Sequence, residues 1–386
     1  GTLVMTKQVE KKDLSLSRST DTDRTYYWQL NADYDRTFGD HAISGLLHFY
    51  LQSRTKSKDS DEDKNVSAVL KPIPRRYEAL SGRVTYNYKQ IYFAEFNIGY
   101  TGSEQFPKNK RFGFFPAVSG GWIPSQYDCL QEALPFLDYL KIRASYGVNG
   151  TLPTDYFGYR GLSSLTNGYL EQPGIIQSQL KNDDLQWETN YNLNLGLDFS
   201  LWNRLNVTLE YYTRTTKNLL MDRPISMTTG FGSYLMNIGK VSNKGVELEI
   251  NSTNIRTKDF SWNTTFNISH NKNEIVTLDG MQTEIIKGTQ IRKVGKSFRT
   301  FYMKEFAGIN PETGAPQFYT NDVDENGNYK KEITEVIDEA HAIVLDKHAE
   351  PNVIGGLSNT LRYKWFDFNF MFSYQFGGYS YDTWAQ

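Results

Sequence analysis

The chain has 386 residues, and its 42 basic and 44 acidic side chains give a formal net charge of -2. This balance gives no reason to expect binding to nucleic acid, because proteins that bind it usually carry a basic face. No apolar run approaches the roughly 18 residues that a transmembrane helix needs, so the sequence excludes a helical membrane protein. Cys129 is the single cysteine, which excludes a disulfide within the chain.

Apolar and polar residues alternate along most of the chain, which is typical of β-strands with one apolar face. A clear example begins at Leu80, where Gly82 and Val84 continue the apolar face and polar residues stand between them. The pattern predicts about twelve strands. The segments with the clearest alternation are, in chain order, 26–34, 43–51, 80–88, 92–100, 140–148, 191–199, 205–211, 246–250, 262–268 and 366–376.

The connections between these segments are of two lengths. The short ones fall near 35–40, 89–90, 201–204, 256–260 and 364–365, and the long ones cover roughly 53–79, 150–186, 216–244 and 271–353. Short turns at one end and long loops at the other are typical of outer-membrane barrels, in which the short turns are periplasmic. The connection 122–139 is longer although it lies at the short-turn end, and we expect a small helix near 128–134.

Charged residues are absent from the apolar faces of these segments. A Lys or Arg at the middle of a bilayer costs roughly 2–4 kcal/mol, so lipid contact explains the exclusion. The opposite faces carry charges that a water-filled or plugged lumen could hydrate. We therefore predict an all-β fold, a transmembrane antiparallel β-barrel; a soluble β-sandwich or propeller that binds glycans is the alternative. The candidate lumen-facing residues are Arg83, Glu95, Arg143, Asp198, Glu210, Arg214, Glu247, Glu249 and Asp367.

The tryptophans agree with a membrane protein. Trp202, Trp262 and Trp365 stand beside short turns, and Trp187 begins a strand after a long loop. Aromatic side chains gather at the two interfaces of membrane barrels, because an amphipathic ring suits the headgroup level. We predict that these four residues belong to such girdles.

Several segments of the chain resemble the barrel of SusC/RagA-type TonB-dependent outer-membrane transporters from Bacteroidetes. They occur in the order found in that family, from about residue 77 to residue 378, and the order makes the resemblance more specific than any one segment. The segments are 111–122 (RFGFFPAVSGGW), 140–150 (LKIRASYGVNG), 237–248 (NIGKVSNKGVEL), 294–297 (VGKS), 308–314 (GINPETG), 355–360 (GGLSNT) and 372–378 (FSYQFGG).

The resemblance implies a barrel of about 22 strands that an N-terminal plug fills. It also implies a SusD-type lipoprotein as a lid, TonB as the energy source, and a glycan or peptide as the imported substrate. Compared with that family, we expect residues 1–386 to contain neither the plug nor the TonB-contacting segment, and residues 381–386 not to be the aromatic terminal strand. We therefore expect residues 1–386 to be a partial barrel domain. The alternative function is a porin-like channel without a plug.

Two motifs that suggest metal binding have simpler interpretations. Asp322, Asp324 and Asn326 resemble the start of a calcium loop, but Ile333 stands where a bidentate Glu is needed, so a turn is favoured and no cofactor or metal is expected. The spacing of His341 and His348, with Asp346 and Glu350 nearby, matches no tight metal-binding pattern and predicts a solvated loop.

Ser44 and His48 are about 13 Å apart along one strand, too far for a catalytic pair, so no enzymatic activity is expected. The loop aromatics Tyr156, Phe157, Tyr159 and Tyr169 could stack on sugars or pack the loops together.

Overall fold

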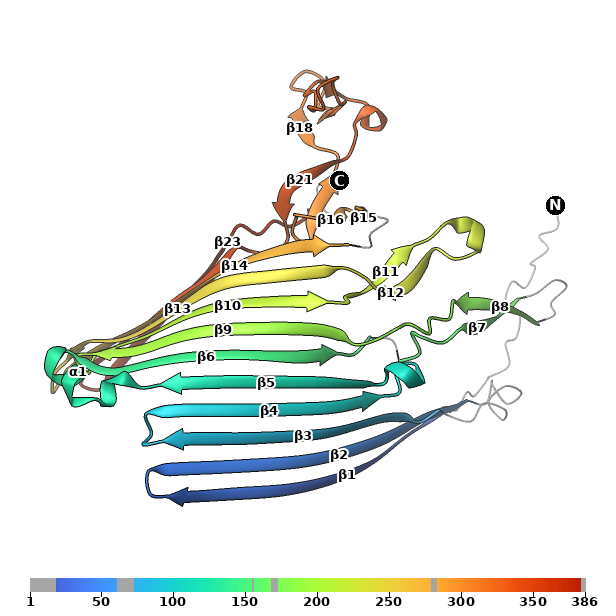
Figure 1. The fold of residues 1–386 in the computed structure, drawn as a ribbon. Coiled ribbons are helices and arrows are strands. Elements are labelled where there is room, and N and C mark those ends of the chain that lie inside the picture. Colours follow the sequence, from blue (N-terminus) through green and yellow to red (C-terminus); the bar gives the residue numbers. More distant parts are fainter. Residues whose placement is uncertain (1–18, 61–72, 155, 168–172, 279–282, 383–386) are drawn as a thin grey trace, which may run out of the picture.

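The computed structural model describes residues 19–60, 73–154, 156–167, 173–278 and 283–382. Its main feature is a curved antiparallel sheet of twelve strands, which we call the wall (Figure 1). Strands that follow one another along the chain are neighbours in the wall, so the topology is a simple meander. The strands are β1 (Ser19–Phe38), β2 (His41–Ser60), β3 (Arg75–Tyr88), β4 (Tyr92–Ser103), β5 (Phe112–Trp122), β6 (Leu137–Thr151), β9 (Glu188–Leu201), β10 (Leu205–Lys217), β13 (Lys240–Arg256), β14 (Phe260–Thr277), β22 (Val353–Tyr363) and β23 (Phe366–Phe376).

Tight turns join the strands at one end of the wall, as predicted. Lys89 and Gln90 between β3 and β4 have φ values of 55° and 56°, and Trp202 and Asn203 between β9 and β10 have 53° and 51°. Positive φ at two successive residues matches the twist of a hairpin, which explains how such short turns close the strand pairs. The one longer connection at this end contains α1 (Asp128–Ala133), so the predicted small helix is confirmed.

The long connections at the other end form small sheets of their own. In Figure 1 the segment from β15 to β21 projects beyond the wall. The additional strands are β7 (Leu162–Asn167), β8 (Pro173–Gln179), β11 (Leu220–Pro224), β12 (Ser233–Asn237), β15 (Glu284–Lys287), β16 (Gln290–Lys293), β17 (Thr300–Met303), β18 (Phe306–Ile309), β19 (Pro316–Tyr319), β20 (Ile333–Thr334) and β21 (Ile343–His348).

Several wall strands are much longer than the alternating segments that predicted them. β13 covers Lys240–Arg256 and β14 covers Phe260–Thr277, whereas the alternation was clear only at 246–250 and 262–268. A tilted strand needs about 9–11 residues to cross the apolar layer. Beyond that layer both faces can be polar, so the period-two pattern disappears while the strand continues.

Side chains that are fully buried gather at the long-loop end. One cluster contains Phe106, Tyr159, Leu185 and Trp187, and another contains Met221, Ile238 and Ile285. Trp187 is only 7% exposed, and its Nε1 donates to the carbonyl of Arg111 at 2.9 Å. The prediction of a girdle position for Trp187 is therefore wrong, because the residue anchors loops. Among the described residues, no helix is long and apolar enough to cross a membrane.

Candidate functional site

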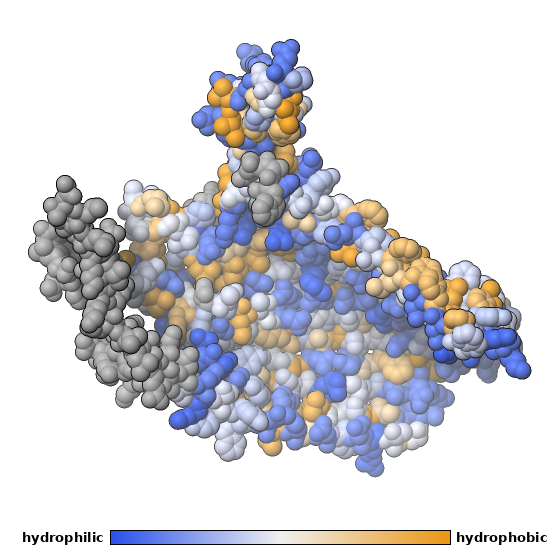
Figure 2. All heavy atoms as spheres, turned by 180° about the vertical axis from the view of Figure 1, so that it is seen from behind, coloured by the Kyte–Doolittle hydropathy of each residue, from blue (hydrophilic) through white to orange (hydrophobic). Residues whose placement is uncertain are grey.

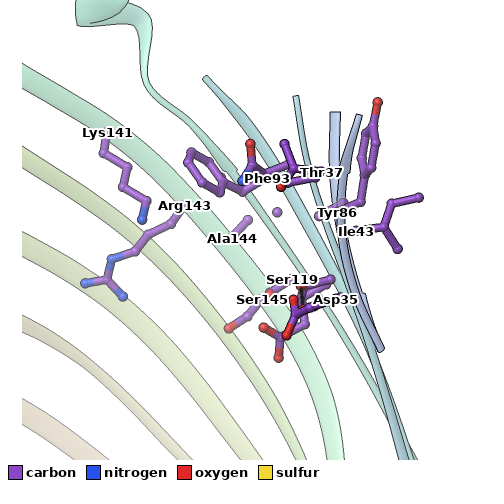
Figure 3. A pocket seen from close by; sticks show the side chains of 18 of the residues that line it. Asp35, Thr37, Ile43, Tyr86, Phe93, Ser119, Lys141, Arg143, Ala144 and Ser145 are labelled. Atoms are coloured by element: carbon purple, nitrogen blue, oxygen red, sulfur yellow. Dashed lines mark hydrogen bonds between the residues drawn. The ribbon is translucent and has the colours of Figure 1, made fainter. Parts of the chain in front are cut away.

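The two faces of the wall differ in chemistry, and the strand register fixes which residues share a face. Val84 is paired with Gly45 and Phe96, so these three residues lie on one face of the wall. We call it the apolar face. Arg83, one residue away, is paired with Leu46 and Asn97 on the opposite face, which we call the polar face. In Figure 3 Ile43 and Tyr86 lie on one side of the strands, and Lys141 and Arg143 lie on the other.

The apolar face is exposed along the whole wall, with large hydrophobic side chains on each strand. Examples from both edges and the centre are Trp28 at 73% exposed, Leu195 at 45% and Phe368 at 62%. Exposed apolar surface of this extent is rare on soluble monomers and marks a surface that another apolar phase covers. In contrast, Figure 2 shows a hollowed side on which hydrophilic residues are spread among apolar ones.

All nine charged candidates share the polar face, as the chain of strand pairings shows. Arg143 is paired with Gly196, which is paired with Glu210, which in turn is paired with Glu247. Asp198 and Glu249 both pair with Thr208. The others reach the same face as partners of polar-face residues: Arg83 with Asn97, Glu95 with Thr85, Arg214 with Asn192 and Asp367 with Arg362.

Three of the candidates form an ion-pair group that links three strands. The Nε of Arg143 on β6 lies 3.0 Å from Oδ2 of Asp198 on β9, and its Nη1 lies 3.1 Å from Oε1 of Glu210 on β10. The Arg143 side chain passes over Gly196, which has no side chain to block it. A Cβ at position 196 would lie 2.5 Å from Arg143 Nε. The three side chains are 34%, 24% and 25% exposed, so water screens the charges only partly.

The other candidates do not join this group. Glu247 accepts a hydrogen bond from Ser269 at 3.2 Å, and Glu249 accepts one from Asn251 at 2.8 Å. At the short-turn end Asp367 forms its own pair with Arg362 at 2.7 Å.

Two candidates are held by asparagines rather than by opposite charges. Arg214 donates to Asn192 at 2.9 Å, and Glu95 accepts from Asn97 at 2.6 Å. Arg83 has no hydrogen bond or ion pair within the described ranges.

Among the hollows on the polar face, two lie toward opposite ends of the strands. One, of about 630 Å³, lies near the short turns of β1–β6, and there Lys141 stands 5.3 Å from the ring centre of Phe93 (Figure 3). The other, of about 740 Å³, lies toward the long loops and is lined mainly by amides and hydroxyls. Its asparagines were not among the candidates, although three of them stand at every second position of β9, a spacing that the sequence shows. The asparagines are Asn97, Asn149, Asn190, Asn192 and Asn194.

The loops beside the second hollow are joined by hydrogen bonds from asparagine side chains of one loop to backbone groups of another. Asn237, at the end of β12, accepts from the amide of Gln186 at 2.8 Å and donates to the carbonyl of Gln186 at 2.7 Å. Asn182 donates to the carbonyl of Leu235 at 2.7 Å. The connection after β8 is thereby fixed to the β11–β12 hairpin, which gives this end of the molecule a defined shape.

The loop aromatics that the structure describes pack against the protein. Tyr156 accepts a hydrogen bond from the amide of Arg76 at 3.0 Å and lies 4.8 Å from the guanidinium of Arg75. Tyr159 is buried, and Phe157 stacks edge-on against Tyr156. Tyr169 lies outside the described residues.

The residues suggested for calcium form a turn. The Asp324 carboxylate accepts hydrogen bonds from the backbone amides of Asn326 at 2.9 Å and Asn328 at 2.8 Å. The bond from Asn328 is the main reason why the pKa of Asp324 lies below its usual value. His341 lies 3.2 Å from Asp322. Over the ranges that the structure describes, no three His, Cys, Asp or Glu side chains come together as metal ligands.

Comparisons with known proteins agree with this architecture. Residues 8–384 match the family described as TonB dependent receptor-like, beta-barrel. TonB-dependent receptor P3 of Formosa agariphila is 34% identical over 318 residues, which cover 77% of this chain and 31% of that protein. TonB-dependent receptor SusC of Bacteroides thetaiotaomicron is 31% identical over 322 residues, covering 78% and 31%.

A solved structure of the RagAB peptide transporter has the same fold as this chain. It superposes with a TM-score of 0.78 at 23% identity, over 94% of this chain and 42% of that one.

The chain belongs to the TonB dependent receptor-like β-barrel family. The predicted family, the all-β barrel fold class and the location in the bacterial outer membrane are thereby confirmed. The chain spans 31% to 38% of the length of the curated relatives that it matches.

Proposed function

We propose that the wall is part of a transporter that imports a glycan or a peptide across the outer membrane, driven by TonB. The observation that carries this proposal is the separation of the two faces over all twelve strands. An apolar face with no charge in its middle suits lipid, and a polar face with ion pairs and amide-lined hollows suits a hydrated path. The relatives are named receptors, so we propose no catalytic step.

The nine charged candidates would then line the lumen. We further propose that strands and a plug outside this chain complete the barrel, because β1 and β23 each have one neighbour in the wall. An unpaired strand edge in lipid leaves backbone groups without partners, which costs several kcal/mol for each group. The short span of the chain relative to its relatives also supports this proposal.

The partners follow from the family rather than from contacts in this chain. We propose a SusD-type lipoprotein as a lid over the long loops and TonB as the partner of the plug. SusC is a relative by sequence, and the RagAB structure is described as a peptide transporter, so both substrate classes stay within the proposal. The lid would rest on the loop end that Asn182 and Asn237 fix in shape.

The test uses the full-length protein in its native membrane. Uptake of labelled oligosaccharides and of labelled peptides is measured in cells with TonB and in cells without it. We expect uptake of one of the two classes, and loss of that uptake without TonB. Uptake that persists without TonB would contradict the proposal.

The porin-like channel gives different results in two measurements. Full-length protein in planar bilayers should show no steady conductance if a plug fills the barrel, whereas a porin-like channel would conduct continuously. The intact mass of the polypeptide from the native membrane adds a second criterion. A mass well above 44.5 kDa agrees with a plugged transporter, and a mass near 44.5 kDa favours the channel.

A further inference from the structure

Four lysines on the apolar side of the wall form two directly opposed pairs. Lys217 of β10 is paired with Lys240 of β13, and Lys244 of β13 is paired with Lys272 of β14. The register places them on the same face as Val246, which is paired with Tyr211. They therefore continue the apolar face toward the long loops, and we call them the lysine cluster.

The lysine cluster lies just beyond the apolar layer. Lys244 lies two residues closer to the long loops than Val246, which is roughly 7 Å along a strand. Lys240 lies four residues further out on the same strand. The rings of Tyr191 and Tyr211 stand on the neighbouring strands of this face, as expected of an interfacial girdle. The ends of β10, β13 and β14 lie side by side at this position (Figure 1).

The cluster carries more positive charge than the protein neutralises. Lys272 lies 2.8 Å from Glu274, and Lys217 lies 4.5 Å from the ring centre of Tyr191. Lys240 and Lys244 have no ion pair among the residues that the structure describes. Like charges directly opposite each other destabilise a sheet, and Glu274 supplies one negative charge against four lysines.

The opposite end of the wall shows a different arrangement. There Lys89 lies 3.5 Å from Asp40, and Arg362 is paired with Asp367. Opposed lysines are thus not a general property of the strand ends. Among the wall pairings that the structure describes, lysine is paired with lysine only at these two places on β10, β13 and β14.

We propose that the lysine cluster binds the phosphate of a lipid headgroup in the outer leaflet of the membrane. A phosphate between the opposed lysines would remove their repulsion, and clustered basic residues at a membrane surface attract anionic headgroups. A lipid is favoured over free phosphate because Val246 is the next residue after Lys244 on this face, where an acyl chain would pack. Tyr211 and Ile268 continue the same face toward the short turns, beyond Thr213 and His270. This site faces outward, so it is separate from the transport path.

The first test measures lipid that purifies with the full-length protein. The double variant K240Q/K244Q is compared with the native protein and with Lys258→Gln. Lys258 is exposed in the short turn between β13 and β14, so the control removes one lysine charge at the other end of these strands. Bound phosphate-bearing lipid, measured by native mass spectrometry, should fall roughly tenfold in the double variant and stay unchanged in the control. An unchanged amount in the double variant, or an equal fall in both, would overturn the proposal.

The second test uses thermal stability and needs only the single variant Lys244→Gln. In neutral detergent the substitution should raise the unfolding temperature, because it removes one charge of an opposed pair. In bilayers that contain phosphate-bearing lipid it should lower the unfolding temperature, because the ligand is lost. The same direction of change in both media would contradict lipid binding. Equal stabilisation of the detergent-solubilised protein by inorganic phosphate would assign the site to free phosphate instead.

Discussion

The wall and the long connections at one end of it are stabilised by different means. In the wall, large apolar side chains such as Leu195 remain about half exposed, so their stabilising effect depends on the lipid around them. In the connections, Leu185 and Phe106 are fully buried in a small core of the kind found in soluble proteins. The wall therefore needs a membrane to be stable, whereas the connections carry their own cores.

The largest effect is expected where a charge enters the apolar face. Leu195→Arg should destabilise the full-length protein in bilayers by about 2–4 kcal/mol, because an arginine near midplane must leave water. Asn194→Arg, one residue away on the polar face, serves as the matched control and should cost well under half as much. Urea unfolding in lipid vesicles measures both. Equal losses would mean that the two faces do not differ in their surroundings.

A smaller and local effect is expected in the connections. Leu185→Ala should destabilise its cluster by about 2–3 kcal/mol, at the low end for a buried leucine because loops can relax around the cavity. The connection 152–187 should then be cleaved faster by protease, while the urea midpoint of the wall stays unchanged. A matching fall in the urea midpoint would show that connections and wall unfold as one unit.

The ion-pair group on the polar face should contribute less. Arg143→Met leaves Asp198 and Glu210 without their cation and should cost about 1–2 kcal/mol, because water still reaches the three groups in part. Arg83→Met is the control, since Arg83 lies on the same face without an ion pair among the described residues. Unfolding in vesicles at low salt compares the two variants. If Arg83→Met is equally costly, the pairing of Arg143 contributes nothing measurable.

The smallest effect is expected at the exposed turn of Asp324. Its pKa is lowered in the folded protein, chiefly by the amide of Asn328, so its contribution to turn stability is present above the unfolded pKa and is lost as pH falls through the folded pKa. Amide hydrogen exchange at Asn326 and Asn328 should therefore lose protection in acid, relative to a pH-matched reference loop. Asp324→Asn should abolish this pH dependence and leave the wall unaffected. A pH dependence that survives in the variant would assign it to another group.

Much of the wall could be predicted from the sequence because each of its features has a local cause. Alternation reveals a strand wherever one face meets lipid and the other meets water, which is why twelve strands, the short turns and the shared face of Arg83 through Asp367 could all be expected. The same local rule would have added the asparagines of β9 to the candidates.

The connections could not be predicted in this way, because contacts between distant segments determine them. The strands from β15 to β21 are two to six residues long, too short for alternation to be visible. Trp187 illustrates the same limit. Its position beside a strand suggested an interface, but Phe106 and Tyr159, which are far away in the sequence, bury it. The pairing of Lys240 with Lys217 also becomes apparent only from the register.

The register of the wall has a consequence for how the protein assembles. A slip by one residue between two strands moves every side chain of the slipped strand to the other face. A strand such as β10 would then present Glu210 and Arg214 to hydrocarbon, and each misplaced arginine alone would cost roughly 2–4 kcal/mol. The charges of the polar face thus disfavour strand pairings in the wrong register during insertion, because each such pairing would place charged side chains in hydrocarbon.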